Sequence, residues 1–424
     1  MTKITRRAAL GAALATPLAA PALAQGTTIE LWSFLDPAGR GTRPEALAHV
    51  IRTFEQANAG AQVRTNVIQW TELGPQLLRA SRAGQVPDVV MLYSPYMAPQ
   101  VAAGTLLSLD DLMKGWSAET RADLITLPIA RDRQNRLYGL PWELRIYGLF
   151  YRTDLFQAAG LGAPETLEQM VSAGTRLQKP PVMGLGASFA PATSTAPIEW
   201  FLPSVVALGG SLLKEDGSAA LVNPATERML AFTHDLVHRH KILSLDAALA
   251  PSDDVQNIGI AGNLAQYFQG SHRLTTMQER SPAGAQWALV PFPAVEASKP
   301  TPISLQGWNL SIPRRARNPE VAFRFMEHWT SVAMQLHQAV AAGYLPVRRS
   351  VARDPAFANE QNRRFGLTEI LEVVAQRPLN FPWPENSDAL NDALGRMIQQ
   401  VITNRMPVKD AMAWGERTYN ELRR

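Results

Sequence analysis

The stretch that decides the fold begins with TTIELWSF (Thr27–Phe34) and closes with VVMLY (Val89–Tyr93). Both segments are rich in the β-branched and aromatic residues that favour strands. Between them, apolar spacing predicts a helix over Pro44–Asn58, a strand over Ala61–Gln69 and a second helix over Leu73–Ala83. Strand–helix–strand–helix–strand in this order predicts an α/β lobe whose parallel sheet is covered on both faces.

A second α/β unit is expected further along the chain. Two short strand-like pieces, Leu137–Pro141 and Tyr147–Tyr151, flank the segment Trp142–Arg145. Gln306–Ile312 has the pattern of another strand, and from Asn318 onward the chain is largely helical. Between these segments the sequence predicts helices near Asp154–Gly160, Pro164–Gln178, Ile198–Leu208, Ala225–Lys241 and Gly259–Phe268, and strands at Val182–Ala187, Leu274–Met277 and Trp287–Pro291.

The composition limits the classes of protein that need considering. The chain has 424 residues with 46% apolar and 18% charged residues, which is longer than one core usually supports, so two lobes are expected. It contains no cysteine, which excludes disulfides, thiolate metal sites, cysteine nucleophiles and a lipidated N-terminal cysteine. The formal net charge is +4 and no basic run occurs, so nucleic acid is not expected as a partner.

The N-terminal segment predicts export. Residues 1–24 combine a basic start with a short apolar run and end in the small-residue pattern Ala22–Ala24, so cleavage is expected near Ala24. The run is too short to span a bilayer. The adjacent Arg6 and Arg7 are typical of a twin-arginine signal, and an ordinary secretory signal with two chance arginines is the alternative. The predicted location is the periplasm.

No catalytic or metal-binding motif stands out. The sequence lacks a Walker A loop, a G-x-G-x-x-G after a strand, a G-x-S-x-G elbow and an H-E-x-x-H. His234 and His238 share a helix face and could bind a metal, but the surrounding charges favour a polar surface. The pairs Asp110–Asp111 and Asp253–Asp254 favour surface or helix-cap positions over acid–base chemistry. No catalytic residue, metal or cofactor is therefore predicted.

The tryptophans indicate a carbohydrate-like solute. The chain contains ten, and five lie where predicted strands end or where lobes would join. Ligands of doubly wound sheets bind beyond the carboxyl ends of the strands, and the apolar face of a sugar stacks well on an indole. Any one tryptophan could be core, but five in the same context favour a binding site. The five are Trp32, Trp70, Trp142, Trp200 and Trp308.

Four segments together resemble the extracellular solute-binding proteins of family 1, the sugar-type receptors of ABC importers. They are Tyr138–Leu155 (YGLP…LFYRTDL), Asp235–Val237 (DLV), Phe268–Met277, in which Thr276 replaces the usual alanine, and Ser311–Arg348 (SIP…NPE…AGYLPVR). The resemblance covers nearly all of the mature chain. It implies a type II-like periplasmic binding protein fold, with two α/β lobes joined by crossover strands and a hinge that closes around the ligand.

The resemblance also implies a division of the chain. Residues 1–24 would form the leader, residues 25–141 plus 306–348 the first lobe, and residues 142–305 the second lobe. Residues 349–424 would form a helical C-terminal region that packs on the lobes.

Arg145 is the departure from the family pattern among the implied cleft residues. It lies four residues beyond the crossover proline, where many family members carry an acid or a small polar residue. Two interpretations stay open: an ion pair between the lobes, or recognition of an anionic group or of adjacent hydroxyls. Arg43, Arg280 and Arg348 lie in neighbouring motifs and favour an anionic solute.

The other implied contacts come from strand ends and from the second lobe. Gly307 would permit close backbone approach, Trp308 would stack on the ligand, and the Tyr344 hydroxyl would complete the pocket. The remaining positions are Phe34, Asp36, Trp70, Ser94, Trp142, Glu199, Trp200, Glu279 and Arg280.

The predicted function is non-covalent binding of a sugar, sugar acid, sugar phosphate or polyol and its delivery to the permease subunits of an ABC importer. A monomer is expected. An exported carbohydrate-active enzyme, a glycosidase or lyase, is the alternative from another class, but it needs a carboxylate pair or a metal in the cleft. Receptors for a polyamine, a peptide or iron are further alternatives; no adjacent tyrosine pair points to iron, and Arg145 disfavours a polyamine.

Overall fold

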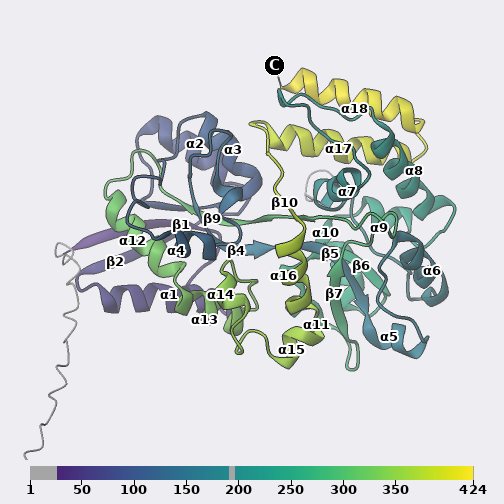
Figure 1. Ribbon diagram of the computed structural model, residues 1–424, viewed down its shortest axis with the longest axis horizontal. Coiled ribbons are helices and arrows are strands. Elements are labelled where there is room, and N and C mark those ends of the chain that lie inside the picture. Colours follow the sequence, from purple (N-terminus) through teal and green to yellow (C-terminus); the bar gives the residue numbers. More distant parts are fainter. Residues whose placement is uncertain (1–25, 191–195, 424) are drawn as a thin grey trace, which may run out of the picture.

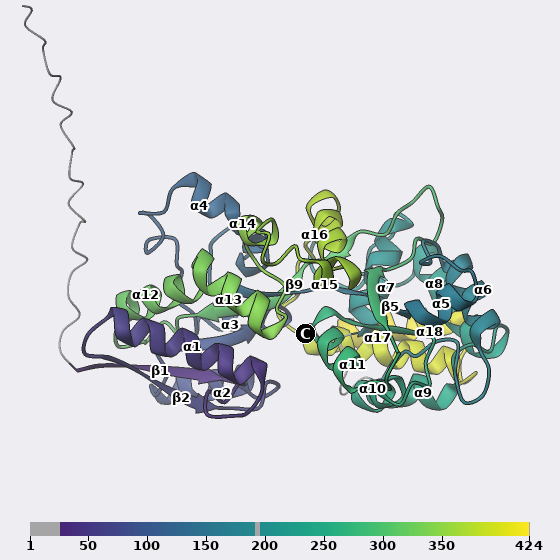
Figure 2. The same cartoon turned by 90° about the horizontal axis from the view of Figure 1, so that it is seen from below.

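The computed structural model describes residues 26–190 and 196–423, and for residues 196–199 the backbone alone. The described chain forms two lobes that lie side by side (Figures 1 and 2). The export leader expected over residues 1–24 lies outside the described residues and stays a prediction. Within the described part, no helix combines the length and apolar character needed to cross a membrane.

The first lobe is built on a five-stranded sheet with the order β2-β1-β3-β9-β4. It contains β1 (Thr27–Ser33), β2 (Ala61–Val67), β3 (Val89–Tyr93), β9 (Gln306–Ser311) and β4 (Leu140–Arg145). β1 pairs in parallel with β2 and β3, whereas β9 runs antiparallel to both of its neighbours. β3 is buried along its whole length, which explains its unbroken apolar sequence. The predicted α/β lobe is confirmed.

Helices cover both faces of this sheet (Figure 1). α2 (Leu73–Ala83) and α3 (Met97–Ala102) lie on one face, and α1 (Thr42–Ala57) and α13 (Val332–Ala342) lie on the other. α2 ends at Gly84, which adopts a left-handed backbone conformation (φ 72°). Glycine is favoured there because it has no side chain to clash in that conformation.

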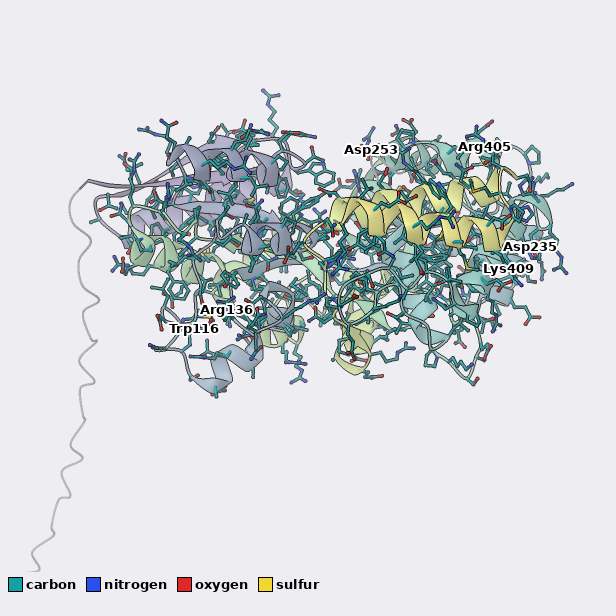
Figure 3. The ribbon with its side chains drawn as sticks, turned by 90° about the horizontal axis from the view of Figure 1, so that it is seen from above. Trp116, Arg136, Asp235, Asp253, Arg405 and Lys409 are labelled. Carbon is teal, nitrogen blue, oxygen red and sulfur yellow. The ribbon has the colours of Figure 1, made fainter. Side chains whose placement is uncertain are left out.

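The second lobe is built on a smaller antiparallel sheet with the order β6-β5-β7. It contains β5 (Tyr147–Arg152), β6 (Gln266–Gly270) and β7 (Trp287–Pro291). The two C-terminal helices α17 (Ser387–Ile402) and α18 (Val408–Leu422), yellow in Figure 3, lie across this lobe. Their buried apolar side chains belong to the same core as those of α7 (Ala196–Ala207) and α8 (Pro224–His238).

The remaining elements are short connections and covering helices. They are α4 (Ala118–Asp123), α5 (Thr153–Ala158), α6 (Leu167–Leu177), α7 (Ala196–Ala207), α8 (Pro224–His238), α9 (Leu245–Leu249), α10 (Ser252–Ile260), α11 (Leu274–Arg280), α12 (Pro319–Trp329), α14 (Arg349–Ala352), α15 (Glu360–Arg364), α16 (Leu367–Gln376), the short strands β8 (Ile303–Ser304) and β10 (Pro378–Leu379), and the 3₁₀ turns η1 (Ser94–Tyr96), η2 (Leu127–Ala130) and η3 (Ser271–Arg273).

Crossover strands join the two lobes. β4 leads through Ile146 into β5, and β8 leads through Leu305 into β9. β8 also pairs in parallel with β10, so the C-terminal part of the chain is tied to the same crossover (Figure 1). This arrangement places the carboxyl ends of β1, β2 and β3 opposite the second lobe. β4 keeps its pairing with β9 as far as Arg145, so the sheet of the first lobe extends past Pro141; the four-part division of the chain stays a prediction.

Several predicted elements are wrong in their details. Leu274–Met277 is the start of helix α11 rather than a strand, because Leu274 and Met277 are buried one helical turn apart. The helix predicted over Gly259–Phe268 is divided, since α10 ends at Ile260 and Gly262 adopts φ 84° before β6 begins. The segment Trp142–Arg145, expected between two strand pieces, is itself part of β4. Val182–Ala187 forms isolated bridges only.

Candidate functional site

A buried ion pair links helix α1 to strand β4 at the edge of the first sheet that faces the second lobe. Nη2 of Arg43 lies 3.0 Å from both carboxylate oxygens of Glu143, whose side chain is 1% exposed. Nε of Arg43 donates to the Tyr344 hydroxyl over 2.9 Å. Burial opposes the charge of Arg43, but Glu143 and Tyr344 outweigh burial and raise the pKa of Arg43. Burial also raises the pKa of Tyr344 to about 12, although Arg43 acts in the opposite direction.

Arg145 shares the same carboxylate less tightly. Its Nε lies 3.3 Å and its Nη2 3.5 Å from the two oxygens of Glu143, two residues away on the same strand. The guanidinium also lies over the rings of Tyr93 and Trp308, at 5.6 and 5.5 Å from their centroids. Of the two interpretations left open for Arg145, the ion pair between the lobes is not formed in this structure, because its carboxylate partner Glu143 belongs to the same strand.

Aromatic rings pack beneath this charged edge. Phe34 lies 4.2 Å from Trp308, and Trp142 lies 5.3 Å from Tyr344, measured between ring centroids. Trp142 and Trp308 are each 1% exposed. These two indoles are therefore part of the core in this structure and support the charged groups; neither presents an open face of the kind expected for stacking on a sugar.

Ser94 and Gly307 make contacts within the sheet of the first lobe. Ser94 is buried, and its Oγ accepts a hydrogen bond from the Gly307 amide over 3.3 Å. A Cβ at Gly307 would lie 2.0 Å from the carbonyl oxygen of Glu143. The close approach expected at Gly307 is thus made by strand β4 rather than by a ligand, and it accompanies a register shift in the β4–β9 pairing between Pro141 and Glu143.

His272 of the second lobe follows Ser271, whose amide donates to the Ile146 carbonyl next to Arg145 over 2.7 Å, and it was not predicted from the sequence. It lies in η3, directly after strand β6, and its ring centroid is 6.2 Å from that of Tyr147. Its pKa is lowered well below 6.5 by burial and by the charges of Arg145, Arg273 and Arg43. The signal that could have found it is its position after a strand end. We call Arg43, Glu143, Arg145, Tyr344 and His272 the charged cluster.

The second-lobe residues expected to contact the solute are not found in the charged cluster. Trp200 is 2% exposed and stacks on Phe268 at 5.2 Å and on Phe292 at 5.3 Å, so it is a core residue. Glu279 and Arg280 are exposed at the C-terminal end of α11. The side chain of Glu199 lies outside the described residues.

The expected first-lobe contacts differ in accessibility. Trp70 is half-buried beside Tyr96, with 6.5 Å between ring centroids. Asp36 is exposed and accepts a hydrogen bond from the Ala38 amide over 2.9 Å. Arg348, which was expected to favour an anionic solute, is buried and pairs with Asp123 over 3.0 Å. Its charge is thus used within the first lobe.

A separate cavity lies beside the crossover, and we call it the side cavity. Its volume is about 1130 Å³, and its walls come from both lobes and from the segment that follows β10. Arg133 bridges the lobes there, because its Nη1 donates to the Glu215 carbonyl over 3.1 Å. No member of the charged cluster lines it. Its walls include Ser94, Met97, residues 128–136, Asp216, Gly217 and residues 380–386.

The histidines that could have bound a metal are engaged in hydrogen bonds. His234 Nε2 lies 2.8 Å from Asn404 Oδ1, and His238 Nε2 lies 2.7 Å from the Ile402 carbonyl. Across residues 26–190 and 196–423, no three histidine or acidic side chains are grouped to hold a metal ion. Asp253, labelled in Figure 3, accepts from Arg273 over 2.7 Å, so this acid belongs to a surface ion pair.

The chain is similar to known solute-binding proteins in sequence. Residues 49–364 match the family described as bacterial extracellular solute-binding protein. A probable ABC transporter-binding protein of Deinococcus radiodurans is 24% identical over 302 residues, covering 68% of this chain and 70% of that protein.

Two solved structures have the same fold. The solute-binding protein of Thermotoga lettingae bound with α-D-tagatose superposes with a TM-score of 0.79 at 22% identity, covering 94% of this chain and all of the other. The solute-binding protein of Agrobacterium radiobacter in complex with ribitol gives a TM-score of 0.75 at 21% identity, covering 94% of this chain and 99% of the other. The two-lobe binding-protein fold is confirmed.

Proposed function

Since the chain belongs to the bacterial extracellular solute-binding protein family, we propose that it binds a carbohydrate-like solute between its lobes and delivers it to the membrane subunits of an ABC importer. The observation that carries the proposal is a backbone contact at the crossover: the Ser271 amide, next to His272, donates to the Ile146 carbonyl, next to Arg145, over 2.7 Å. A solute that touches the side chains of Arg145 and His272 stabilises the closed arrangement of the lobes, which is the form that a permease can distinguish from an empty receptor.

The charged cluster suits polar recognition better than chemistry. Arg145 and His272 offer hydrogen-bond donors, and the aromatic rings under Arg145 hold its guanidinium in place. The nearest carboxylate, Glu143, is buried and bound by Arg43, so it is not free to act as an acid or a base on a sugar. We therefore propose that the solute is released unaltered, with no bond made or broken.

A thermal-shift screen tests the proposal. Tagatose, maltose, ribitol, sugar acids and sugar phosphates are added separately to the purified mature protein, and a solute that binds only the native state raises the melting temperature. Arg145→Gln should abolish the shift of the best solute, whereas the matched control Arg133→Gln, in the side cavity, should retain it. No shift with any of these solutes would contradict the function. The reverse pattern of the two variants would place the solute in the side cavity.

We further propose that the protein acts in the periplasm as a monomer after cleavage near Ala24. The family match supports an exported location, and the adjacent Arg6 and Arg7 support the twin-arginine route. Replacing both arginines with lysine should block export by that route, which fractionation of cells would detect as retained precursor. Undiminished periplasmic protein would instead favour the ordinary secretory route.

A further inference from the structure

The charges of the charged cluster do not balance. Glu143 is the one carboxylate of the charged cluster, and it lies 3.0 Å from Arg43 through both of its oxygens. Arg145 reaches the same oxygens only over 3.3 and 3.5 Å. Two guanidinium groups therefore share one buried carboxylate, and the cluster retains one positive charge. Arg145 is the arginine that is bound less closely.

Arg145 also has hydrogen-bonding capacity to spare. Among the described residues it donates to Glu143 alone, from Nε and Nη2, so Nη1 is left for another acceptor. Its side chain is 13% exposed, so part of the guanidinium side chain is accessible to a solute. A partly buried cation with an open donor favours an anionic acceptor, because hydrogen bonds between charged groups are the stronger ones.

Among the described residues of the second lobe, no acid acts on His272 to restore the balance. Arg273 follows His272 in η3, but Asp253 of α10 neutralises it over 2.7 Å. The groups that face His272 are the phenol of Tyr147 on β5, the guanidinium groups of Arg145 and Arg43, and Arg273 itself. Nδ1 of His272 is buried and has no hydrogen-bond partner among the described residues.

We propose that the solute carries a single carboxylate, as a sugar acid does, and that this carboxylate binds between Arg145 of the first lobe and His272 of the second. The inference rests on the proposed function and names the class of its solute. One negative charge cancels the one excess positive charge of the cluster. A neutral sugar leaves that charge uncompensated as the lobes close around it, which costs free energy in a site that excludes water.

The same geometry links binding to proton uptake. Without a solute, burial and then the neighbouring arginines lower the pKa of His272 and favour its neutral form. A carboxylate placed beside the ring favours its protonated form, so binding takes up a proton and the affinity rises as the pH falls from 8 to 6. A neutral solute provides no such counter-charge, and its affinity falls or stays constant over the same range.

Isothermal titration calorimetry tests the inference with D-glucuronate and D-glucose at pH 6, 7 and 8, in two buffers that differ in ionisation enthalpy. We expect glucuronate to bind at least tenfold more tightly than glucose, and its binding to be accompanied by proton uptake.

Arg145→Gln should lower the glucuronate affinity at least tenfold, and Arg145→Lys, which keeps the charge, should lower it less. His272→Gln should remove the pH dependence. Arg79→Gln, in an exposed pair with Glu72, is the control and should change neither affinity nor pH dependence.

The outcomes separate the two proposals. Equal or tighter binding of glucose, or unchanged glucuronate affinity in a folded Arg145→Gln protein, would overturn the monocarboxylate and leave the receptor function standing. Tighter binding of glucose 6-phosphate than of glucuronate would also overturn it, in favour of a dianion. Failure of every sugar, sugar acid and sugar phosphate to bind would count against the receptor function itself.

Discussion

Arg43 and Glu143 lie 100 residues apart in the sequence, yet one guanidinium nitrogen of Arg43 contacts both oxygens of a carboxylate that is almost completely buried. The pair fixes the first turn of α1 against the strand that leads into the second lobe. Because Tyr344 accepts a hydrogen bond from the same guanidinium, three distant segments of the first lobe meet at this point.

Removal of Arg43 should destabilise the protein strongly. In Arg43→Ala, Glu143 keeps its buried charge and loses its closest partner, which typically costs about 3–5 kcal/mol in the free energy of unfolding. Urea unfolding followed by circular dichroism measures the loss. Arg79→Ala breaks an exposed pair with Glu72 and should cost less than about 1 kcal/mol. Equal effects of the two variants would mean that Arg145 alone suffices to hold Glu143.

A side chain at Gly307 should disturb the crossover. The Cβ of Gly307→Ala would lie 2.0 Å from the Glu143 carbonyl, so β4 must move away from β9. We expect a clear drop in melting temperature by calorimetry and weaker binding of the solute. Gly115→Ala is the matched control, since a Cβ there meets no atom within 4 Å. An unchanged melting temperature in Gly307→Ala would show that the β4–β9 pairing tolerates the shift.

Without a solute, stability should decrease as the pH falls through about 6.5. The pKa of His272 is lowered by burial and nearby arginines, and the pKa of His328 and of His337 is lowered chiefly by burial. The unfolded chain therefore binds more protons than the native protein below the ordinary histidine pKa, which favours unfolding by at most about 1.4 kcal/mol per pH unit for each group. Melting temperatures between pH 7.5 and 5.5 measure the slope. His272→Gln should make the slope shallower. An identical slope in that variant would contradict the contribution of His272 to the pH dependence of stability.

Truncation of Trp200 should affect the second lobe as a core substitution does. Trp200→Ala removes an indole packed between Phe268 and Phe292 and should cost about 3–5 kcal/mol in the free energy of unfolding. Val222→Ala, at a side chain that is 56% exposed, should change it by less than about 0.5 kcal/mol. Urea unfolding compares the two. Loss of solute binding at full stability in Trp200→Ala would return this residue to the binding site.

Long, regular patterns were predictable from the sequence, whereas short ones were not. Apolar spacing over many residues predicted strands β1 and β3. It also predicted a helix over Pro44–Asn58, which is observed at Thr42–Ala57. Leu274–Met277 is only four residues long, which is too short to separate a strand period from a helix period. Its helical form depends on burial against the rest of the second lobe.

The site was predicted in part, because its key contacts are long-range. Trp142 and Arg145 were predicted as site residues but Glu143 between them was not, since nothing local indicates that α1 brings Arg43 to that carboxylate. His272 was overlooked because β6 was predicted as the end of a helix, which concealed the strand end that the histidine follows.

The position of α17 and α18 on the second lobe has a consequence for biosynthesis. Tyr419 near the C-terminus is fully buried, and its hydroxyl donates to Asn386 Oδ1 over 2.9 Å inside the lobe that begins near residue 147. The strands and helices of the first sheet are all present once residue 342 has left the ribosome. A nascent chain that ends before α17 thus carries all elements of the first sheet, whereas the apolar surface of the second lobe is covered only after residues 387–422 have been made.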